Sequence, residues 1–287
     1  MRHMGQQFAL QDYRSEGELL GSARQQGHRA RDQRRRAILT RTVQLDVIPR
    51  LLTAHNAPLQ APPVLVVDPT HVQELVGLVL SRGEPAAVAF VESMREQGAG
   101  AEEIYLDLLA PAARRLGVMW DEDECDFTEV TVGLWRLQSA MRELSPSFLD
   151  QPTQRTDGPC ILLVPLPGES HTFGLSMVYE FFRRAGWNAW SGPVADSADM
   201  TAMVRGEHVD VVGFSLSCDE RLETVYSEIR AVRRASRNPR LSVMVGGPPF
   251  ASNPLLAAQL GADGTATDGR KAVAQAQALV EDSRARS

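Results

Sequence analysis

The sequence predicts a helical bundle followed by a doubly wound parallel α/β sheet. Apolar residues recur at helical spacing between positions 69 and 144, whereas short apolar runs alternate with helical patterns from position 160 onward. Five strand and helix units in the second region indicate a parallel sheet with helices on both faces. A chain of 287 residues is long enough for these two domains.

The composition is that of an ordinary globular protein, with 43% hydrophobic and 23% charged residues. No apolar run approaches the length of about eighteen residues that a membrane span needs, and the first residues lack the apolar core of a signal peptide. We therefore expect a cytoplasmic protein without a membrane contact. The net charge of -6 argues against general nucleic-acid binding through bulk electrostatics. The three cysteines have no C-x-x-C spacing and predict neither a disulfide framework nor a zinc site.

Residues 1–60 are polar and rich in arginine, which predicts a flexible arm. The spacing of its apolar residues allows one helix at 29–52. Clustered arginines are typical either of an arm that binds a partner or nucleic acid, or of a solvated helix face. His28 and His55 have no partner at metal-ligand spacing, and we interpret both as exposed polar residues.

Residues 61–148 are predicted to form a four-helix bundle. Helices are expected at 69–81, 84–97, 101–117 and 125–144. Pro69 and Pro85 suit the first turns of two of them, and Gly83 is a stop signal between the two. Antiparallel neighbours are the natural packing for such helices. The proline-rich stretch 145–159 then links the bundle to the second domain.

The second domain is predicted at residues 158–285. Strands are expected near 160–166, 188–191, 209–216, 241–246 and 264–267, and helices near 174–185, 197–206, 219–235, 252–260 and 269–282. The continuous apolar run at 209–216 is typical of a buried central strand. The chain has no G-x-G-x-x-G after a strand and no G-x-x-x-x-G-K-[ST]. It therefore lacks the phosphate-binding loops of dinucleotide-binding and P-loop proteins.

The loop after the first strand holds the clearest functional signal. It contains Glu169, His171 and Gly174 in the order E-x-H-x-x-G. Open α/β sheets bind ligands at the carboxyl ends of their strands, where this loop is expected. An imidazole there can bind a metal through one nitrogen while a carboxylate holds the other and fixes the tautomer. Taken alone, a loop histidine is more often an exposed polar residue.

Two further motifs follow along the chain. They are Ser215-Leu216-Ser217, about forty residues after Gly174, and Gly246-Gly247, just under thirty residues after Ser217. With these pieces the chain resembles the cobalamin-binding domain of corrinoid proteins, whose motif is D-x-H-x-x-G, then S-x-L, then G-G. Glu169 replaces the usual Asp, and Ser217 stands where Leu is usual. The resemblance implies a Rossmann-like, flavodoxin-like fold for the second domain.

The resemblance also implies a ligand: cobalamin in a base-off form, with His171 as the lower axial metal ligand. Glu169 would hold the other imidazole nitrogen, and Gly174 would let the cobalamin tail pass close to a helix. The cofactor-binding residues that it implies are Glu169, His171, Thr172, Gly174, Ser215, Leu216, Ser217, Gly246, Gly247, Trp120, Val130 and Thr131. From the residues alone, the serines fit a strand-end turn equally well, and the glycine pair fits a tight turn.

The predicted helices from Ile104 to Gln138 resemble the helical cap that precedes the cobalamin domain in corrinoid proteins. An apolar or aromatic side chain of that cap covers the upper face of the corrin, and Trp120 occupies the matching place. Light sensors that use adenosylcobalamin have a Glu-His pair about ten residues later, where this chain has Val130-Thr131. Because the groups that would contact an adenosyl ligand are missing, hydroxocobalamin is the expected form. Periodicity alone favours a core tryptophan.

The chain resembles more closely the AerR/PpaA antirepressors of purple photosynthetic bacteria. Their pattern W-x-x-D-x-x-x-F-x-x-V-T-x-G-x-x-R-L-Q runs here from Trp120 to Gln138. The resemblance implies a light-responsive transcription regulator of photosynthesis genes, which acts by protein contact on a CrtJ/PpsR-type repressor. No helix-turn-helix with a recognition helix is evident, so direct DNA binding is not expected.

Two other classes stay open at this point. A corrinoid carrier for methyl transfer, or a subunit of a cobalamin-dependent mutase, would share the cap and the ligand motif. The missing Glu-His pair, the missing catalytic partner domain and the arginine-rich arm favour a regulator that is not an enzyme. Related sensor domains that bind heme lack the histidine motif, so His171 argues against heme.

Overall fold

The computed structural model describes residues 65–148, 158–169, 171–192 and 196–285. All of them belong to one compact unit, residues 63–287. The arm predicted at residues 1–60 lies outside the described residues, together with its expected helix, His28 and His55. No helix in the described part of the chain is both long and apolar enough to cross a membrane.

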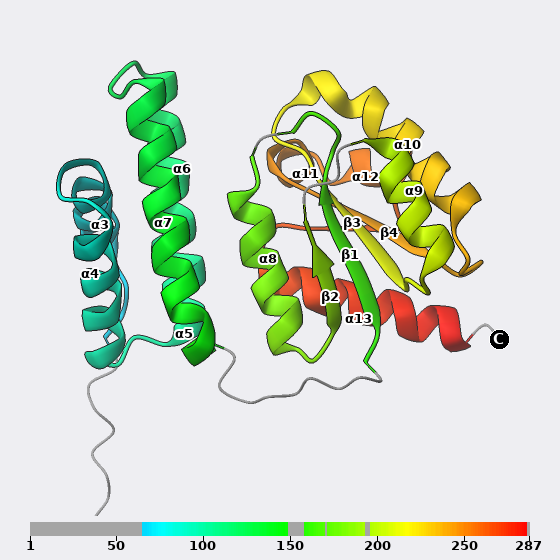
Figure 1. Cartoon of the computed structure of the whole chain (residues 1–287), viewed down its shortest axis with the longest axis horizontal. Helices are drawn as coiled ribbons and strands as arrows, with labels where there is room; N and C mark the ends of the chain where they lie inside the picture. The colour runs from blue at the N-terminus through cyan, green and yellow to red at the C-terminus, as the bar shows by residue number, and fades with distance from the viewer. Residues whose placement is uncertain (1–64, 149–157, 170, 193–195, 286–287) are drawn as a thin grey trace, which may run out of the picture. The chain divides into compact units, whose positions relative to one another are not determined.

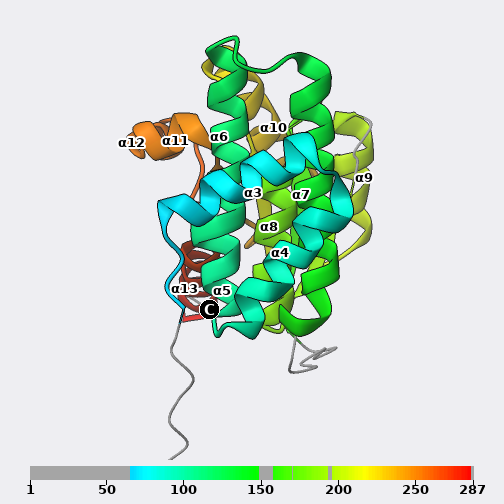
Figure 2. The same cartoon turned by 90° about the vertical axis from the view of Figure 1, so that its left-hand side faces the viewer.

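Helices make up the first described region, from residue 65 to residue 148 (Figure 2). Their bounds are α3 Pro69–Ser81, α4 Glu84–Glu96, α5 Ala101–Glu103, α6 Ala110–Asp121 and α7 Phe127–Phe148. The start of α3 follows from Asp68, whose carboxylate accepts hydrogen bonds from the backbone N–H groups of Thr70 and His71. Pro69 then takes the first helical position, where an N–H would have no partner.

A π-helical turn, η2 (Ile104–Leu109), joins α5 to α6 where the sequence predicts an uninterrupted helix. The backbone N–H of Ala110 donates to the carbonyl of Tyr105, which lies five residues earlier rather than four. Pro111 explains the wider turn, because proline has no N–H and its ring crowds the carbonyl four residues before it, that of Asp107. Leu106 and Asp107 of this turn line a cavity that is described below.

The second described region is a five-stranded parallel sheet with helices packed on it (Figure 1). Its strands are β1 Cys160–Pro165, β2 Asn188–Ser191, β3 Val211–Ser215, β4 Ser242–Gly246 and β5 Gly264–Ala266, in the order β2-β1-β3-β4-β5. The helices are α8 Phe173–Arg184, α9 Ser197–Gly206, α10 Leu222–Ala235, α11 Pro248–Ser252, α12 Leu255–Gln259 and α13 Gly269–Ala285. The predicted fold class, a helical domain followed by a Rossmann-like sheet, is confirmed.

The helix predicted near 252–260 is shorter in the structure, where α12 covers Leu255–Gln259 and a separate short helix, α11, precedes it at Pro248–Ser252. The two helices are separated at Asn253, whose φ of -140° and ψ of 86° are not helical. The cause is Pro254, because a residue that precedes proline avoids the helical region.

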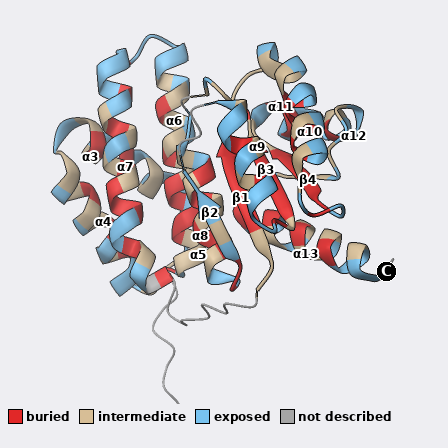
Figure 3. Ribbon diagram, turned by 45° about the vertical axis from the view of Figure 1, so that its right-hand side comes forward, coloured by how far each residue is buried: buried red, intermediate tan, exposed pale blue. Residues whose placement is uncertain are grey.

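Alternate residues of the central strands β1 and β3 pack on opposite faces of the sheet. Leu162 and Val212 belong to one apolar core, which includes side chains of α9, α10, α11 and α12. Ile161 and Val211 belong to the other, with side chains of α8 and α13. Figure 3 shows β1 and β3 as buried elements between these layers. Burial on both faces explains why the sequences of β1, β3 and β4 are nearly continuous apolar runs.

An aromatic cluster joins the helical region to the sheet region. The ring of Tyr105 stacks on that of Phe148 with centroids 4.2 Å apart, and Phe148 meets Phe181 of α8 edge-on at 5.0 Å. The Tyr105 hydroxyl donates to the carbonyl oxygen of Met141 at 3.2 Å, so its buried polar atom is satisfied.

Polar contacts surround this cluster. Glu102 of α5 pairs with Arg184 of α8 at 3.4 Å and with Arg270 of α13 at 2.7 Å. Further along α7, the Gln138 amide donates to the Ser176 hydroxyl at 3.4 Å. These side chains are partly exposed, so each ion pair contributes at most about 1 kcal/mol. Burial of the aromatic rings is therefore the main stabilising contribution at the junction.

Replacing Phe181 with alanine should lower the free energy of unfolding by about 3 to 5 kcal/mol, because a cavity would replace a ring that is 4% exposed. Urea denaturation followed by circular dichroism measures the change. Phe127→Ala is the matched control, since the same atoms are removed from a ring that is 71% exposed, and its loss should stay below about 1 kcal/mol. Equal losses in the two variants would contradict the packing described at the junction.

Candidate functional site

Glu169 connects the loop after β1 with the loop after β3. Its Oε1 accepts from the backbone N–H of His171 at 2.9 Å and lies 2.6 Å from His171 Nδ1. Its Oε2 accepts from the backbone N–H and the hydroxyl of Ser217, at 2.9 and 2.5 Å. The Glu169 side chain is 3% exposed, whereas the His171 side chain is 59% exposed. We call Ser217, Glu169 and His171 the relay.

The relay fixes the charge of Glu169 and the tautomer of His171. Burial alone would raise the pKa of Glu169, but hydrogen bonds from Ser217 and His171 outweigh it and lower the pKa to about 2. The carboxylate is therefore ionised at neutral pH and acts only as an acceptor. It favours the tautomer with a proton on Nδ1, which leaves a free lone pair on Nε2. An imidazole held in this way can bind a metal through Nε2.

Local backbone features shape the loop that carries the relay. Gly168 has a φ of +78°, a region that favours glycine. The N–H of Glu169 donates to the carbonyl of Leu166 at 2.8 Å and closes the turn. Arg221 donates to the carbonyl of Pro167 at 3.0 Å, which ties the loop to the segment that leads into α10.

A cavity of about 730 Å³ lies on the face of the sheet that α8 and α13 cover. Leu163 and Gly213 from neighbouring strands line it, and Gly174 of α8 borders it. A Cβ on Gly213 would lie 2.7 Å from Leu163 Cδ2, so this position has room for glycine but not for a larger residue. A Cβ on Gly174 would meet nothing within 4 Å, so open space reaches the backbone of α8.

Gly247 marks a close approach between the chain segments after β3 and β4. Its φ is +115°, and a Cβ there would lie 1.9 Å from the carbonyl oxygen of Leu216. The Leu216 N–H donates to the Gly246 carbonyl at 3.1 Å, which ties the two segments together. A Cβ on Gly246 itself would lie 3.9 Å from its nearest neighbour, an ordinary contact distance.

The structure separates the predicted residues of the sheet domain into two sets. Those that line the cavity are Gly174, Ser215, Gly246 and Gly247. Those of the relay are Glu169, His171 and Ser217. Thr172 is exposed and precedes α8. Leu216 is 1% exposed and packs on the opposite face of the sheet.

Of the predicted cap residues, two are exposed and one is buried. Trp120 is 45% exposed near the end of α6. Thr131 is exposed on α7, and its hydroxyl donates to the carbonyl of Phe127 at 2.7 Å. Val130 is 7% exposed and packs in the core of the helical region. None of these three lines the cavity found among the described residues, so their position over a ligand stays a prediction.

Sequence reasoning missed the side chains that the helical region contributes to the cavity. They are Leu106 and Asp107 of η2, with Ala110 and Arg114 of α6. Single charges on a helix have no diagnostic spacing, so no sequence signal was available for them. Gly213 did carry a signal, because an isolated glycine inside a strand often marks a close approach.

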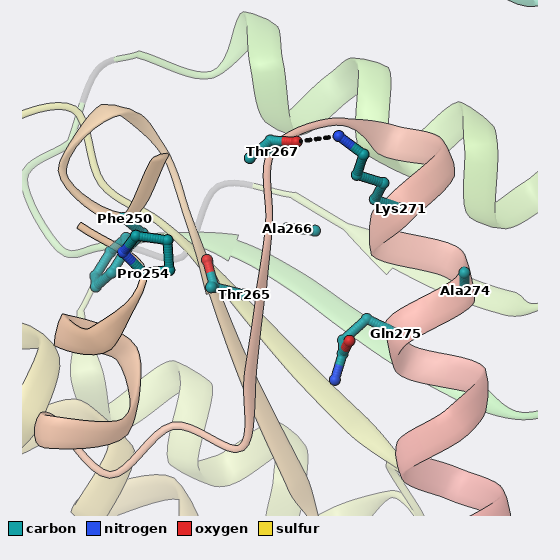
Figure 4. A pocket seen from close by; sticks show the side chains of 8 residues that line it. All are labelled: Phe250, Pro254, Thr265, Ala266, Thr267, Lys271, Ala274 and Gln275. Atoms are coloured by element: carbon teal, nitrogen blue, oxygen red, sulfur yellow. Dashed lines mark hydrogen bonds between the residues drawn. The ribbon is translucent and has the colours of Figure 1, made fainter. Parts of the chain in front are cut away.

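A second, smaller hollow of about 430 Å³ lies beside β5 (Figure 4). Lys271 Nζ donates to the Thr267 hydroxyl at 2.9 Å on its rim. Thr265 lines the hollow, and its hydroxyl oxygen is buried without a hydrogen-bond partner. None of the residues predicted for a ligand lines this space, so the larger cavity is the better candidate site.

Comparison with known proteins identifies both regions. The family described as B12 binding domain matches residues 159–276, and a second B12 binding domain family matches residues 72–145. The chain is a cobalamin-binding domain protein. The two matches fall on the sheet region and on the helical region.

Three known proteins that are similar to this cobalamin-binding domain protein are described below. An uncharacterized 20.5 kDa protein in the bchF-crtJ intergenic region of Rhodobacter capsulatus is 25% identical over 162 residues, which cover 56% of this chain and 84% of that protein. The monomethylamine corrinoid protein of Methanosarcina barkeri has a similar structure, with a TM-score of 0.60, 16% identity, and coverage of 74% of this chain and 98% of that chain. The similarity to the Methanosarcina barkeri protein shows a shared fold only. A cobalamin-binding protein from Desulfitobacterium hafniense DCB-2 aligns with a TM-score of 0.40, 18% identity, and coverage of 72% of this chain and 98% of that chain.

The residues of this cobalamin-binding domain protein fit a corrinoid. A corrin supplies the equatorial ligands of its own cobalt, so the protein needs to provide an axial ligand only. Within the described residues, no group of three or more His, Cys, Asp or Glu side chains is placed to hold a bare metal ion. His171, with Nδ1 held by a carboxylate, suits the axial role. The volume of the cavity beside α8, about 730 Å³, is in the usual range of small-molecule binding pockets.

Gly247→Ala should destabilise the protein by at least about 2 kcal/mol, because the new Cβ would clash with the Leu216 carbonyl at an unfavourable φ. Gly246→Ala is the matched control at the adjacent position, and its effect on unfolding should stay within about 1 kcal/mol. Thermal and urea denaturation of the two ligand-free variants measure the difference. Similar stabilities would argue against the close approach described at Gly247.

Proposed function

We propose that the chain binds cobalamin base-off, with His171 Nε2 as the lower axial ligand of cobalt. The observation that carries this proposal is the relay, in which a nearly buried, ionised carboxylate holds Nδ1 of a half-exposed imidazole. The cavity on the α8 and α13 face would take the nucleotide tail, since Gly174 and Ser215 border it. Hydroxocobalamin is the proposed form, because Val130 and Thr131 replace the Glu-His pair of adenosylcobalamin sensors.

We further propose that the chain is a light-responsive antirepressor that contacts a CrtJ/PpsR-type repressor of photosynthesis genes. Support comes from the similarity to the Rhodobacter capsulatus protein whose description places it between bchF and crtJ. The cobalt–carbon bond of an alkylcobalamin such as adenosylcobalamin is photolabile, so light would change which form of cobalamin is available for binding. A form that prefers one arrangement of the helical and sheet regions shifts the population toward the state that binds the partner. Trp120 is proposed to cover the upper face of the corrin.

A corrinoid carrier for methyl transfer is the second candidate. The same relay would serve a carrier, because axial ligation by His171 does not depend on what happens at the other face of the corrin. The fold shared with the Methanosarcina barkeri monomethylamine corrinoid protein is compatible with this candidate.

His171→Ala should abolish the band shift that hydroxocobalamin undergoes on binding and should weaken its binding by about tenfold or more, because the axial ligand is lost. Visible absorption after gel filtration measures both effects. His208→Ala is the matched control, since its side chain is also 59% exposed and lies 3.6 Å from a carboxylate, that of Asp210. A shift that survives in His171→Ala would refute ligation by His171. Wild-type protein that retains no corrinoid would refute the proposed function.

The regulator and the carrier differ in what they do when loaded. A regulator should bind a purified CrtJ/PpsR-type repressor about five- to 150-fold more tightly with hydroxocobalamin than with adenosylcobalamin in darkness, which is the usual range of allosteric coupling. Calorimetric titration measures the ratio, and His171→Ala should bring it close to one. A carrier would instead transfer methyl from bound methylcobalamin to a thiol acceptor. Transfer with no change in repressor affinity would refute the regulator.

A further inference from the structure

Arg114 is the cationic side chain of the main cavity. Among the described residues that line this cavity, it is the one Lys, Arg or His. The lining also contains buried apolar side chains, such as those of Leu163 and Met244. A guanidinium is permanently charged and presents several N–H donors in one plane, so it favours an anionic ligand group.

Arg114 is also free to act. Neither Arg114 nor Asp107, its acidic neighbour in the cavity lining, has a hydrogen-bond or ion-pair partner within the described part of the chain. The adjacent Arg115 contrasts with it, because its guanidinium pairs with Glu122 at 3.2 Å and Glu124 at 2.7 Å. Two successive arginines of α6 therefore differ. Arg115 forms ion pairs with nearby acids, whereas the guanidinium of Arg114 can bind a ligand in the cavity.

Asp268, the other acid that lines the cavity, already has a cationic partner. Asp268 accepts from the backbone N–H of Lys271 at 2.8 Å, and its Oδ2 lies 3.2 Å from Lys271 Nζ. Of the two acids that line the cavity, Asp107 is the one whose negative charge has no cationic partner among the described residues. Asp107 also brings an acceptor, which suits the amide side chains that surround a corrin.

The start of α8 adds a second favourable contribution for an anion. Gly174, in the first turn of this 12-residue helix, borders the cavity. The residue before the helix, Thr172, makes no side-chain capping bond to the free N–H groups of that turn. Uncapped N–H groups and the helix dipole both favour negative charge at this place.

We propose that Arg114 binds the phosphodiester of the nucleotide tail of cobalamin and thereby selects corrinoids that carry this tail. The proposal rests on the cobalamin binding proposed above. The phosphodiester is the anionic group of the tail, and two of its oxygens match parallel N–H donors of a guanidinium. Arg114 is thus a specificity-determining residue that acts from the helical region on a ligand group held by the sheet region.

The test compares wild type, Arg114→Gln, Arg114→Lys and Arg115→Gln. Arg114→Gln should weaken hydroxocobalamin binding about tenfold or more, as expected for a lost charge-assisted hydrogen bond. Arg114→Lys should recover part of the affinity, and Arg115→Gln should match wild type. The ³¹P resonance of bound hydroxocobalamin should move in Arg114→Gln and stay unchanged in Arg115→Gln. Cobinamide, which lacks the phosphodiester, should bind wild type and Arg114→Gln equally.

Three outcomes would overturn the proposal. An unchanged ³¹P resonance or an unchanged affinity in Arg114→Gln would show that Arg114 does not contact the phosphodiester. A loss for cobinamide equal to that for hydroxocobalamin would assign Arg114 to the corrin ring instead. Wild-type protein that retains no hydroxocobalamin would refute the proposed function as well, whereas the first two outcomes leave cobalamin binding intact.

Discussion

The site depends on a single carboxylate. Glu169 uses one oxygen for the imidazole of His171 and the other for Ser217, so two loops that are far apart in the sequence share one charge. The two departures from the corrinoid motif are therefore coupled in the structure. Glu is longer than Asp, and Ser217 offers a hydroxyl where the motif has Leu, so the longer side chain finds a second partner. These hydrogen bonds outweigh the cost of burying the charge, which keeps His171 in one tautomer.

The register of the parallel sheet explains why three motifs that are distant in the sequence meet at the carboxyl ends of the strands. Pro165 pairs with Ser215, and Ser215 pairs with Gly246, so the ends of β1, β3 and β4 lie side by side. The sequence predicts this meeting, because each strand and helix unit returns the chain to the same edge of the sheet. The type of nearly every element and the positions of its apolar residues follow from the same periodicity.

Other features depend on contacts that periodicity does not contain. Val130 and Thr131 are neighbours in the sequence, but one residue along a helix turns the side chain by about 100°, so one is buried and the other exposed. The sequence does not indicate that Arg114 lines a cavity, because this depends on how the fold places α6. The breaks at η2 and between α11 and α12 were within reach of prediction, since both follow from Pro111 and Pro254.

The unequal anchoring of α7 has a mechanical consequence. Its ring and hydrogen-bond contacts with α8 lie between Gln138 and Phe148, whereas Phe127 begins the helix eleven residues before Gln138. At about 1.5 Å per residue, roughly 16 Å of helix extend past the last of these contacts. The first half of α7 packs in the core of the helical region through Val130, so the helix moves only together with that region. A rotation of the helical region by about 10° about these contacts moves the beginning of α7 by roughly 3 Å. That displacement is close to the thickness of a flat aromatic ring, so a small rearrangement at the base is enough to admit or exclude a planar group at the tip.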